Sequence, residues 1–263
     1  MKAIKLGFAV AVSVLLSLGP ASTQQLVKAG YAPFAPPLSF LPGATLDNYR
    51  TLDPNGNLAQ GALIDLMNAV GKDAGVQIQF VMVPASEQIA ALGSNKIDLA
   101  LMVNIGRPGA HFTDSLYKDS EALLVKKGDP KQYVTWEDLK GEVVVAIKGS
   151  AAAGAAKQSG LFREVRLVTA GAEVAQAVRL PEVRAGFKGS FIDTTYDQQH
   201  GAYEPDVQMS TSYRPRFAVE RAIAARNGDA LLNKINISLA KLTNDGTLKA
   251  IFTKYGIEGT LVK

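Results

Sequence analysis

The sequence predicts an α/β protein built around parallel sheets. From Gln60 onward, apolar residues recur first at helical spacing and then with period two, which indicates a helix followed by a strand. The run Ile97–Val103 is almost continuously apolar, as expected of a strand covered on both faces of a parallel sheet. A comparable alternation of strands and helices returns between residues 126 and 213. This alternation is typical of α/β folds, whose open sheets bind ligands at the carboxyl ends of their strands.

The first elements follow from apolar periodicity and from turn residues. A strand at 26–31 is expected to end at the prolines that follow it, because proline cannot continue a central ladder. Residues 38–58 are rich in turn signals and predict a long loop, which in a compact domain is usually functional or mobile. The helical spacing covers 63–70, and the strict alternation at 76–83 predicts a strand buried mainly on one face.

Polar residues then follow the buried strand. A short helix at 87–92 is expected to start with Ser86 as its N-cap. Only after the apolar strand that ends at Val103 does the chain place Asn104 and Arg107. We therefore expect both side chains at the ligand-binding edge of a sheet.

The second half of the chain repeats the same elements. Thr135 is positioned to cap a short helix, and Ser150 stands at the beginning of a helix of small residues. The segment Ser190-Phe-Ile-Asp193 is expected to end a short strand. The remaining elements expected in chain order are strands at 122–125, 143–147, 165–168 and 216–225, and helices at 151–158, 174–178, 231–242 and 247–255.

The N-terminus has the three parts of a secretory signal peptide. Residues 1–5 are basic, 6–18 are apolar, and 19–23 are small and turn-prone. An uncleaved membrane anchor is the alternative, but the apolar part is too short to span a bilayer comfortably. The sequence contains no cysteine, so it offers neither a lipid-attachment residue nor a disulfide. We expect an exported periplasmic protein, cleaved near residues 21–25.

Charge says little about the partners of the exported protein. Removal of residues 1–23 takes away Lys2 and Lys5 and no acid, which leaves a charge of 28 − 2 − 24 = +2. No block of like charges and no basic stripe with interleaved aromatic residues is present. Nucleic acid is therefore not an expected partner.

Six motifs follow one another over nearly the whole exported chain. They are Tyr31-Ala-Pro-Phe34, Gly61 to Gly71 with Asp65 at an acidic position, Ile89 to Asp98, Arg107 before Phe112 to Tyr117, Asp138 to Ser150, and Asn244 to Tyr255. In this order they resemble the periplasmic polar amino-acid-binding proteins of ABC importers, bacterial solute-binding protein family 3. The resemblance implies a two-lobed periplasmic-binding-protein fold of type II, with the ligand in the cleft between the lobes. Residues 26–121 with 220–263 would form one lobe and 126–213 the other, and the hinge strands would lie near 122–125 and 217–222.

The resemblance also implies a set of ligand-binding residues. Arg107 would bind the carboxylate of an amino acid, since its fork reaches both oxygens, although a surface arginine is the alternative. Asp193 would accept the ammonium, with helix capping as the alternative. Ser150 and the amide of Ala151 begin a helix, which suits a carboxylate. The last two candidates are Asn104, otherwise a turn residue, and Tyr31, placed like an aromatic that covers the ligand and otherwise a core residue.

The chain departs from the family pattern at several of these positions. Ala151 stands where threonine is usual, so only its backbone could donate. Ala85 replaces an aromatic residue that usually stacks on the ligand, and the approach to the arginine is shortened to Asn104-Ile-Gly-Arg107. The first loop carries an insertion. We hypothesise that the pocket is enlarged or reshaped, and that its ligand need not be an ordinary polar amino acid.

Other functional classes remain open. The fold also hosts periplasmic enzymes such as cyclohexadienyl dehydratases, for which Glu87 or Glu182 could be nominated as general acid. The sequence lacks a nucleophilic cysteine and the common hydrolase and metal motifs, and its two histidines, His111 and His200, are far apart. We therefore predict a monomeric binder without cofactor or metal. The resemblance implies that it serves the membrane subunits of an ABC transporter. A ligand-sensing module for a membrane receptor would have the same pocket.

Overall fold

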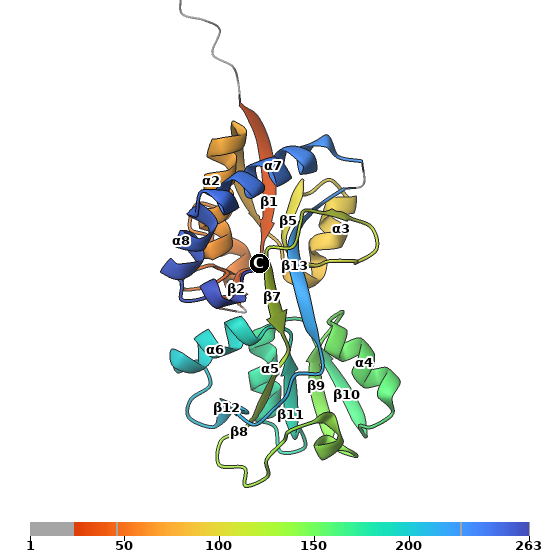
Figure 1. Ribbon diagram of the computed structural model, residues 1–263. Helices are drawn as coiled ribbons and strands as arrows, with labels where there is room; N and C mark the ends of the chain where they lie inside the picture. The colour runs from red at the N-terminus through yellow and green to blue at the C-terminus, as the bar shows by residue number, and fades with distance from the viewer. Residues whose placement is uncertain (1–23, 46, 227, 263) are drawn as a thin grey trace, which may run out of the picture.

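Two separate main sheets divide the protein into an upper and a lower part (Figure 1). The computed structural model describes residues 24–45, 47–226 and 228–262, so the predicted signal peptide at 1–23 lies outside the described residues. None of the described helices has both the length and the apolar character needed to cross a membrane. We call each sheet with its helices a lobe.

The first lobe is built on a sheet in the order β4-β1-β5-β13-β6, with β7 also paired to β13. Its strands are β1 (Gln25–Tyr31), β4 (Val76–Met82), β5 (Leu99–Asn104), β6 (His111–Phe112), β7 (Tyr117–Ser120) and β13 (Ala218–Ala225). Strand β1 is parallel to both β4 and β5, and β13 runs antiparallel to β5. Strand β5 is buried along nearly its whole length, which confirms the prediction from its apolar run.

Helices cover both faces of this sheet. The amphipathic helix α2 (Ala62–Ala74) packs with α7 (Ala230–Asn244) and α8 (Thr247–Lys254) in the larger apolar core. Helix α3 (Gln88–Gly93), preceded by the 3₁₀ turn η1 (Ala85–Glu87), packs on β5 in a smaller one. A last 3₁₀ turn, η3 (Glu258–Thr260), follows α8.

The second lobe has its own sheet in the order β10-β9-β11-β8-β12. Its strands are β8 (Ala122–Lys126), β9 (Val143–Ile147), β10 (Glu164–Val168), β11 (Ala185–Lys188) and β12 (Val207–Met209). Strands β9, β10 and β11 run parallel, and β8 is antiparallel to β11 and β12. The accompanying helices are the 3₁₀ turn η2 (Trp136–Leu139), α4 (Ala151–Ser159), α5 (Gly171–Val178) and α6 (Phe191–Gln199).

The chain crosses between the lobes twice, side by side. It leaves the first sheet after β7 and enters the second at β8, and it returns just before β13. We call residues 117–121 and 217–221 the crossing ribbon, because β7 and β13 pair there and the amide of Glu121 donates to the carbonyl of Phe217 at 3.4 Å. Residues 122–125 lie within the second sheet rather than between the sheets. The predicted lobe boundaries and the closing movement of the lobes stay predictions. Glu121 and Phe217 lie at the crossing.

Three local predictions differ from the structure. The segment 38–58 is not all loop, because it contains the strand β3 (Ser39–Phe40), paired to β2 (Phe34–Ala35), and the short helix α1 (Tyr49–Leu52). Ser86 does not cap a helix, since it lies inside η1, which runs directly into α3. Strand β4 is half-exposed along most of its length because it forms an edge of its sheet.

A fourth difference affects the site. The segment Ser190-Phe-Ile-Asp193 does not end a strand, because β11 already ends at Lys188. Ser190 is instead the N-cap of α6, and its Oγ accepts the amide N–H of Asp193 at 3.2 Å. This side-chain cap satisfies one of the free donors at the start of a helix, which stabilises the helical over the extended form. Asp193 therefore lies in the first turn of α6.

Close packing of α5 on β11 fixes the strand that leads into α6. A Cβ atom added at Gly186 would lie 2.4 Å from Cγ1 of Val174 and 2.9 Å from Cγ2 of Val178. We expect Gly186→Ala to lower the free energy of unfolding by about 1–3 kcal/mol, because overpacking forces the helix off the sheet. Urea denaturation followed by circular dichroism measures this. Gly154→Ala, in open space on α4, is the matched control and should stabilise slightly.

Candidate ligand-binding site

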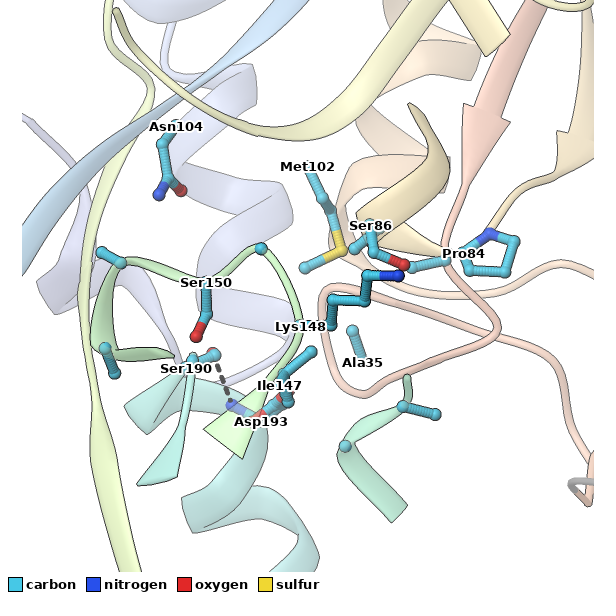
Figure 2. A pocket seen from close by; sticks show the side chains of 18 of the residues that line it. Ala35, Pro84, Ser86, Met102, Asn104, Ile147, Lys148, Ser150, Ser190 and Asp193 are labelled. Carbon is cyan, nitrogen blue, oxygen red and sulfur yellow. Dashed lines mark hydrogen bonds between the residues drawn. The ribbon is translucent and has the colours of Figure 1, made fainter. Parts of the chain in front are cut away.

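A cavity of about 160 Å³ lies between the two lobes and is lined from both of them. Figure 2 shows Asn104 and Met102 of the first lobe on one side, and Ser150, Ser190 and Asp193 of the second lobe on the other. Much of the wall consists of segments that follow the parallel strands β1, β5, β9, β10 and β11. The carboxyl ends of both sheets therefore meet at this cavity, where open α/β sheets bind their ligands.

Arg107 reaches the cavity from the loop after β5. It forms no hydrogen bond or ion pair with any residue in the described part of the chain, so its guanidinium donors are available. A Cβ added at Gly149 of the second lobe would lie 3.6 Å from Nη2 of Arg107, which brings the guanidinium close to the loop before α4. A planar guanidinium in this position can bind both oxygens of a carboxylate.

The N-terminus of α4 supplies further donors to the same cavity. Ser150 is its N-cap, and the Oγ of Ser150 accepts the amide N–H of Ala153 at 3.0 Å. Its hydroxyl oxygen is thus engaged in capping. Ala151 and Ala152 line the cavity, and their N–H groups belong to the first turn, which has no acceptors within its own helix. These amides and the helix dipole favour an anion.

Asn104 ends β5 and lies directly opposite Arg221 of β13 in the strand register. Both residues line the cavity. The Oδ1 of Asn104 and the Nε of Arg221 are buried and have no hydrogen-bond partner among the described residues. Buried polar atoms of this kind are normally paired, so both atoms point to a ligand or water that would complete them.

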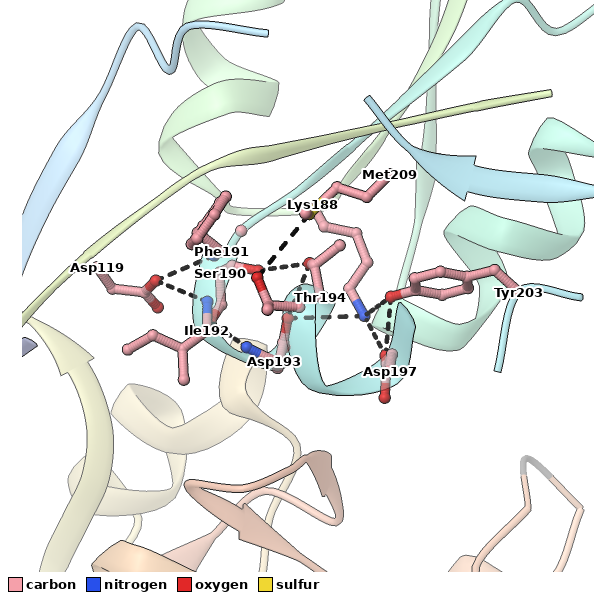
Figure 3. A network of polar contacts seen from close by, with 12 residues as sticks. Asp119, Lys188, Ser190, Phe191, Ile192, Asp193, Thr194, Asp197, Tyr203 and Met209 are labelled. Carbon is pink, nitrogen blue, oxygen red and sulfur yellow. Dashed lines mark hydrogen bonds and ion pairs between the residues drawn. The ribbon is translucent and has the colours of Figure 1, made fainter. Parts of the chain in front are cut away.

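Asp193 lines the cavity but its carboxylate is already engaged (Figure 3). Its side chain is only 11% exposed, and Nζ of Lys188 lies 3.7 Å from its Oδ1. The hydroxyl of Thr194 donates to the same oxygen at 3.0 Å. Burial raises the pKa of Asp193 to about 7, against the opposing charge of Lys188, and the nearby Asp197 and Asp119 raise it further. The carboxylate of Asp193 is therefore shared with the Lys188 cation, and only part of its hydrogen-bonding capacity is left for a ligand ammonium.

Comparison with known proteins assigns the chain to a family. The family described as bacterial extracellular solute-binding proteins, family 3, matches residues 43–258. The chain belongs to this family. It is 24% identical over 219 residues to a protein named probable histidine-binding protein from Neisseria gonorrhoeae, with 79% of this chain and 78% of the relative covered.

Solved structures of binding proteins superimpose on nearly the whole chain. An ancestral arginine-binding protein bound to glutamine has a TM-score of 0.72 and 26% identity, and the match covers 89% of this chain and 98% of that one. The substrate-binding protein of an ABC uptake transporter from Streptococcus pneumoniae, solved with bound histidine, has a TM-score of 0.74 and 20% identity, with 90% and 95% covered. The expectation of a two-lobed periplasmic-binding-protein fold is confirmed.

One residue predicted for the site of this family-3 protein does not reach the cavity. Tyr31 has 0% exposure, its ring packs edge-on against Phe80, and its hydroxyl donates to Oδ2 of Asp53 at 3.4 Å. The side chain belongs to the apolar core of the first lobe. Phe34, three residues later and outside β1, is the aromatic residue of this segment that lines the cavity.

Sequence reasoning missed several residues that line the cavity of this family-3 protein. They are Phe34, Glu121, Lys148, Thr169, Phe217, Val219 and Arg221. One signal was present in β13, where the charged residues Glu220 and Arg221 separate two apolar parts of the strand. Lys148 also follows directly after the buried strand β9. No group of three or more His, Cys, Asp or Glu side chains within the described ranges could hold a metal ion.

Proposed function

We propose that this family-3 protein captures a small amino-acid-like ligand between its lobes outside the cytoplasm and delivers it to the membrane subunits of an ABC transporter. The observation that carries the proposal is the guanidinium of Arg107, unpaired among the described residues, in a cavity lined by both lobes. The relatives named for histidine binding and solved with glutamine or histidine support an amino-acid-like ligand.

The ligand carboxylate would bind to Arg107 and to the amides of Ala151 and Ala152. These groups come from different lobes, so one carboxylate can be held from both sides at once. Asn104 also lines the cavity, and its unpartnered Oδ1 would accept a hydrogen bond from the ammonium of the same ligand. Taking a carboxylate out of water is costly unless its oxygens are paired, and these donors provide that pairing.

Ligand binding would be coupled to closure of the two lobes. It would dock first on Arg107 of the first lobe and then recruit Asp193 and α4 of the second. Contacts that exist only when both lobes meet the ligand favour the closed state by their differential free energy. Bending would be confined to the crossing ribbon, where the chain passes between the sheets.

Export would follow from the signal peptide predicted at 1–23, and the periplasm would be the place of action. An importer partner is the primary proposal, because the S. pneumoniae structure is named as part of an ABC uptake transporter. A membrane receptor is the alternative partner, and copurification with membrane subunits separates the two.

A thermal-shift screen of residues 24–263 against amino acids, opines and small carboxylates tests the proposal. A ligand that binds only the folded protein stabilises it by about 2.7 kcal/mol at a hundred times its dissociation constant, so a true ligand raises the melting temperature. We expect at least one hit, recovered chemically unchanged after incubation. A hit that is consumed would instead indicate an enzyme, and no shift with any compound would contradict the proposed function.

A further inference from the structure

Glu121 places a buried carboxylate in the wall of the cavity, at the point where the chain leaves the first lobe. The residue is only 4% exposed. Its Oε1 accepts the amide N–H of Arg216 at 2.9 Å, the indole N–H of Trp136 at 3.3 Å and the hydroxyl of Tyr213. Its Oε2 is also buried but has no hydrogen-bond partner in the described part of the chain.

No cation among the described residues forms an ion pair with this carboxylate. The nearby guanidinium of Arg216 lies over the ring of Trp136 instead, 4.8 Å from its centroid. Three donors on Oε1 favour the ionised form, while burial raises the pKa of Glu121. A buried carboxylate is costly without a counter-charge, and here the unpartnered oxygen belongs to a residue that lines the cavity.

The crossing ribbon arranges this carboxylate along one face with other lining residues. Ala218 pairs with Ser120 and Val219 with Asp119, which places Phe217 beside Glu121. Alternate residues of a strand share a face, and Phe217, Val219 and Arg221 all line the cavity. The ribbon therefore presents Glu121 and Phe217 at its lower end, Val219 in the middle, and Arg221 at its upper end, about 13 Å along the strand from Phe217.

We propose that Glu121 binds a basic nitrogen of the ligand through Oε2. The ligand class is then a carboxylate that carries an amine or guanidine several bonds away, with its methylene chain against Phe217 and Val219. This inference rests on the proposed function, which binds the carboxylate of the same ligand at Arg107. It adds a specificity residue beside the apolar stretch of Phe217 and Val219.

Isothermal titration calorimetry on residues 24–263 tests the assignment with two pairs of ligands that differ in charge at their far end. The pairs are L-arginine with L-citrulline, and L-ornithine with L-norvaline. A hydrogen bond to a charged group contributes about 1.5–3 kcal/mol, so the basic member of a pair should bind roughly tenfold to a hundredfold more tightly. Glu121→Gln should reduce this ratio to about one, because its amide keeps an acceptor for Tyr213 and Arg216 but removes the charge.

Glu137→Gln is the matched control, because Glu137 is exposed on the second lobe and does not line the cavity. It should leave the ratio unchanged. Equal affinity within both pairs in the unmodified protein, or an unchanged ratio in Glu121→Gln, would overturn the role of Glu121. If other amino acids bind while the basic ones do not, the inference fails and the proposed function stands. If no amino acid of any charge binds, both fail.

Discussion

Replacing Arg107 with alanine should weaken ligand binding by about thirtyfold or more and leave the fold intact. The guanidinium forms no hydrogen bond or ion pair with the described residues, so its removal breaks none of the polar interactions that stabilise the fold. Truncating one partner of a desolvated charge pair costs about 2–5 kcal/mol. That loss weakens binding by roughly thirtyfold to several thousandfold. Calorimetric titration with the ligand from the screen measures the affinity, and thermal unfolding without ligand checks the fold.

Arg163→Ala is the matched control for this variant. Arg163 is an exposed arginine of the second lobe that does not line the cavity, so its removal changes the net charge equally without touching the site. We expect the control to bind as tightly as the unmodified protein. Unchanged affinity in Arg107→Ala would remove Arg107 from the site and, with it, the main support for carboxylate binding there.

Replacing Lys188 with methionine should destabilise the second lobe strongly. Lys188 is only 2% exposed, and its Nζ lies 2.9 Å from Oδ2 of Asp197 and 3.2 Å from the hydroxyl of Tyr203, as well as near Asp193 (Figure 3). Burial alone would lower the pKa of Lys188, but the surrounding carboxylates outweigh it and raise the pKa, so the cation persists at neutral pH. Breaking a buried pair by removing one partner costs about 3–5 kcal/mol. The melting temperature should fall by on the order of 10 °C.

Two further variants separate charge from packing in this cluster. Lys157→Met on α4 removes an exposed lysine and should leave the melting temperature nearly unchanged. Adding Asp197→Asn to Lys188→Met should recover part of the loss, because it removes a carboxylate left without its cation. A melting temperature of Lys188→Met equal to that of the unmodified protein would show that the ion pairs do not stabilise the fold.

The sequence predicted the strands and helices that depend on apolar periodicity. The apolar run at Ile97–Val103 became the buried strand β5, and the helical spacing after Gln60 became α2. The placement of Arg107 and Asn104 followed directly, because residues just after a buried strand lie at the edge where such sheets bind ligands. This part of the site depends on local sequence and sheet topology together.

Local sequence could not decide which way the segment at Ser190 would fold. The apolar residues Phe191 and Ile192 between two polar ones suit a strand end as well as a first helical turn. The hydrogen bond from the amide of Asp193 to the Ser190 Oγ caps the helix and stabilises the helical form. In the folded protein the Asp193 side chain lies near Lys188, and the Tyr31 side chain lies in the core of the first lobe. Both positions depend on residues that are distant in the sequence.

The role inferred for Glu121 also lay beyond the sequence. A single glutamate between two strands carries no local signal of burial. Its significance comes from Trp136, Tyr213 and Arg216, which come from distant segments and together occupy Oε1 while leaving Oε2 free. An unpaired buried atom can be recognised only once every neighbour is placed.

A crystal structure of residues 24–263 with the tightest ligand from the screen would test the central claim most directly. We predict that the ligand lies between the lobes, with its carboxylate bound by the guanidinium of Arg107 and by the first amides of α4. A ligand bound outside this cavity, or bound inside it without contact to Arg107, would contradict the account.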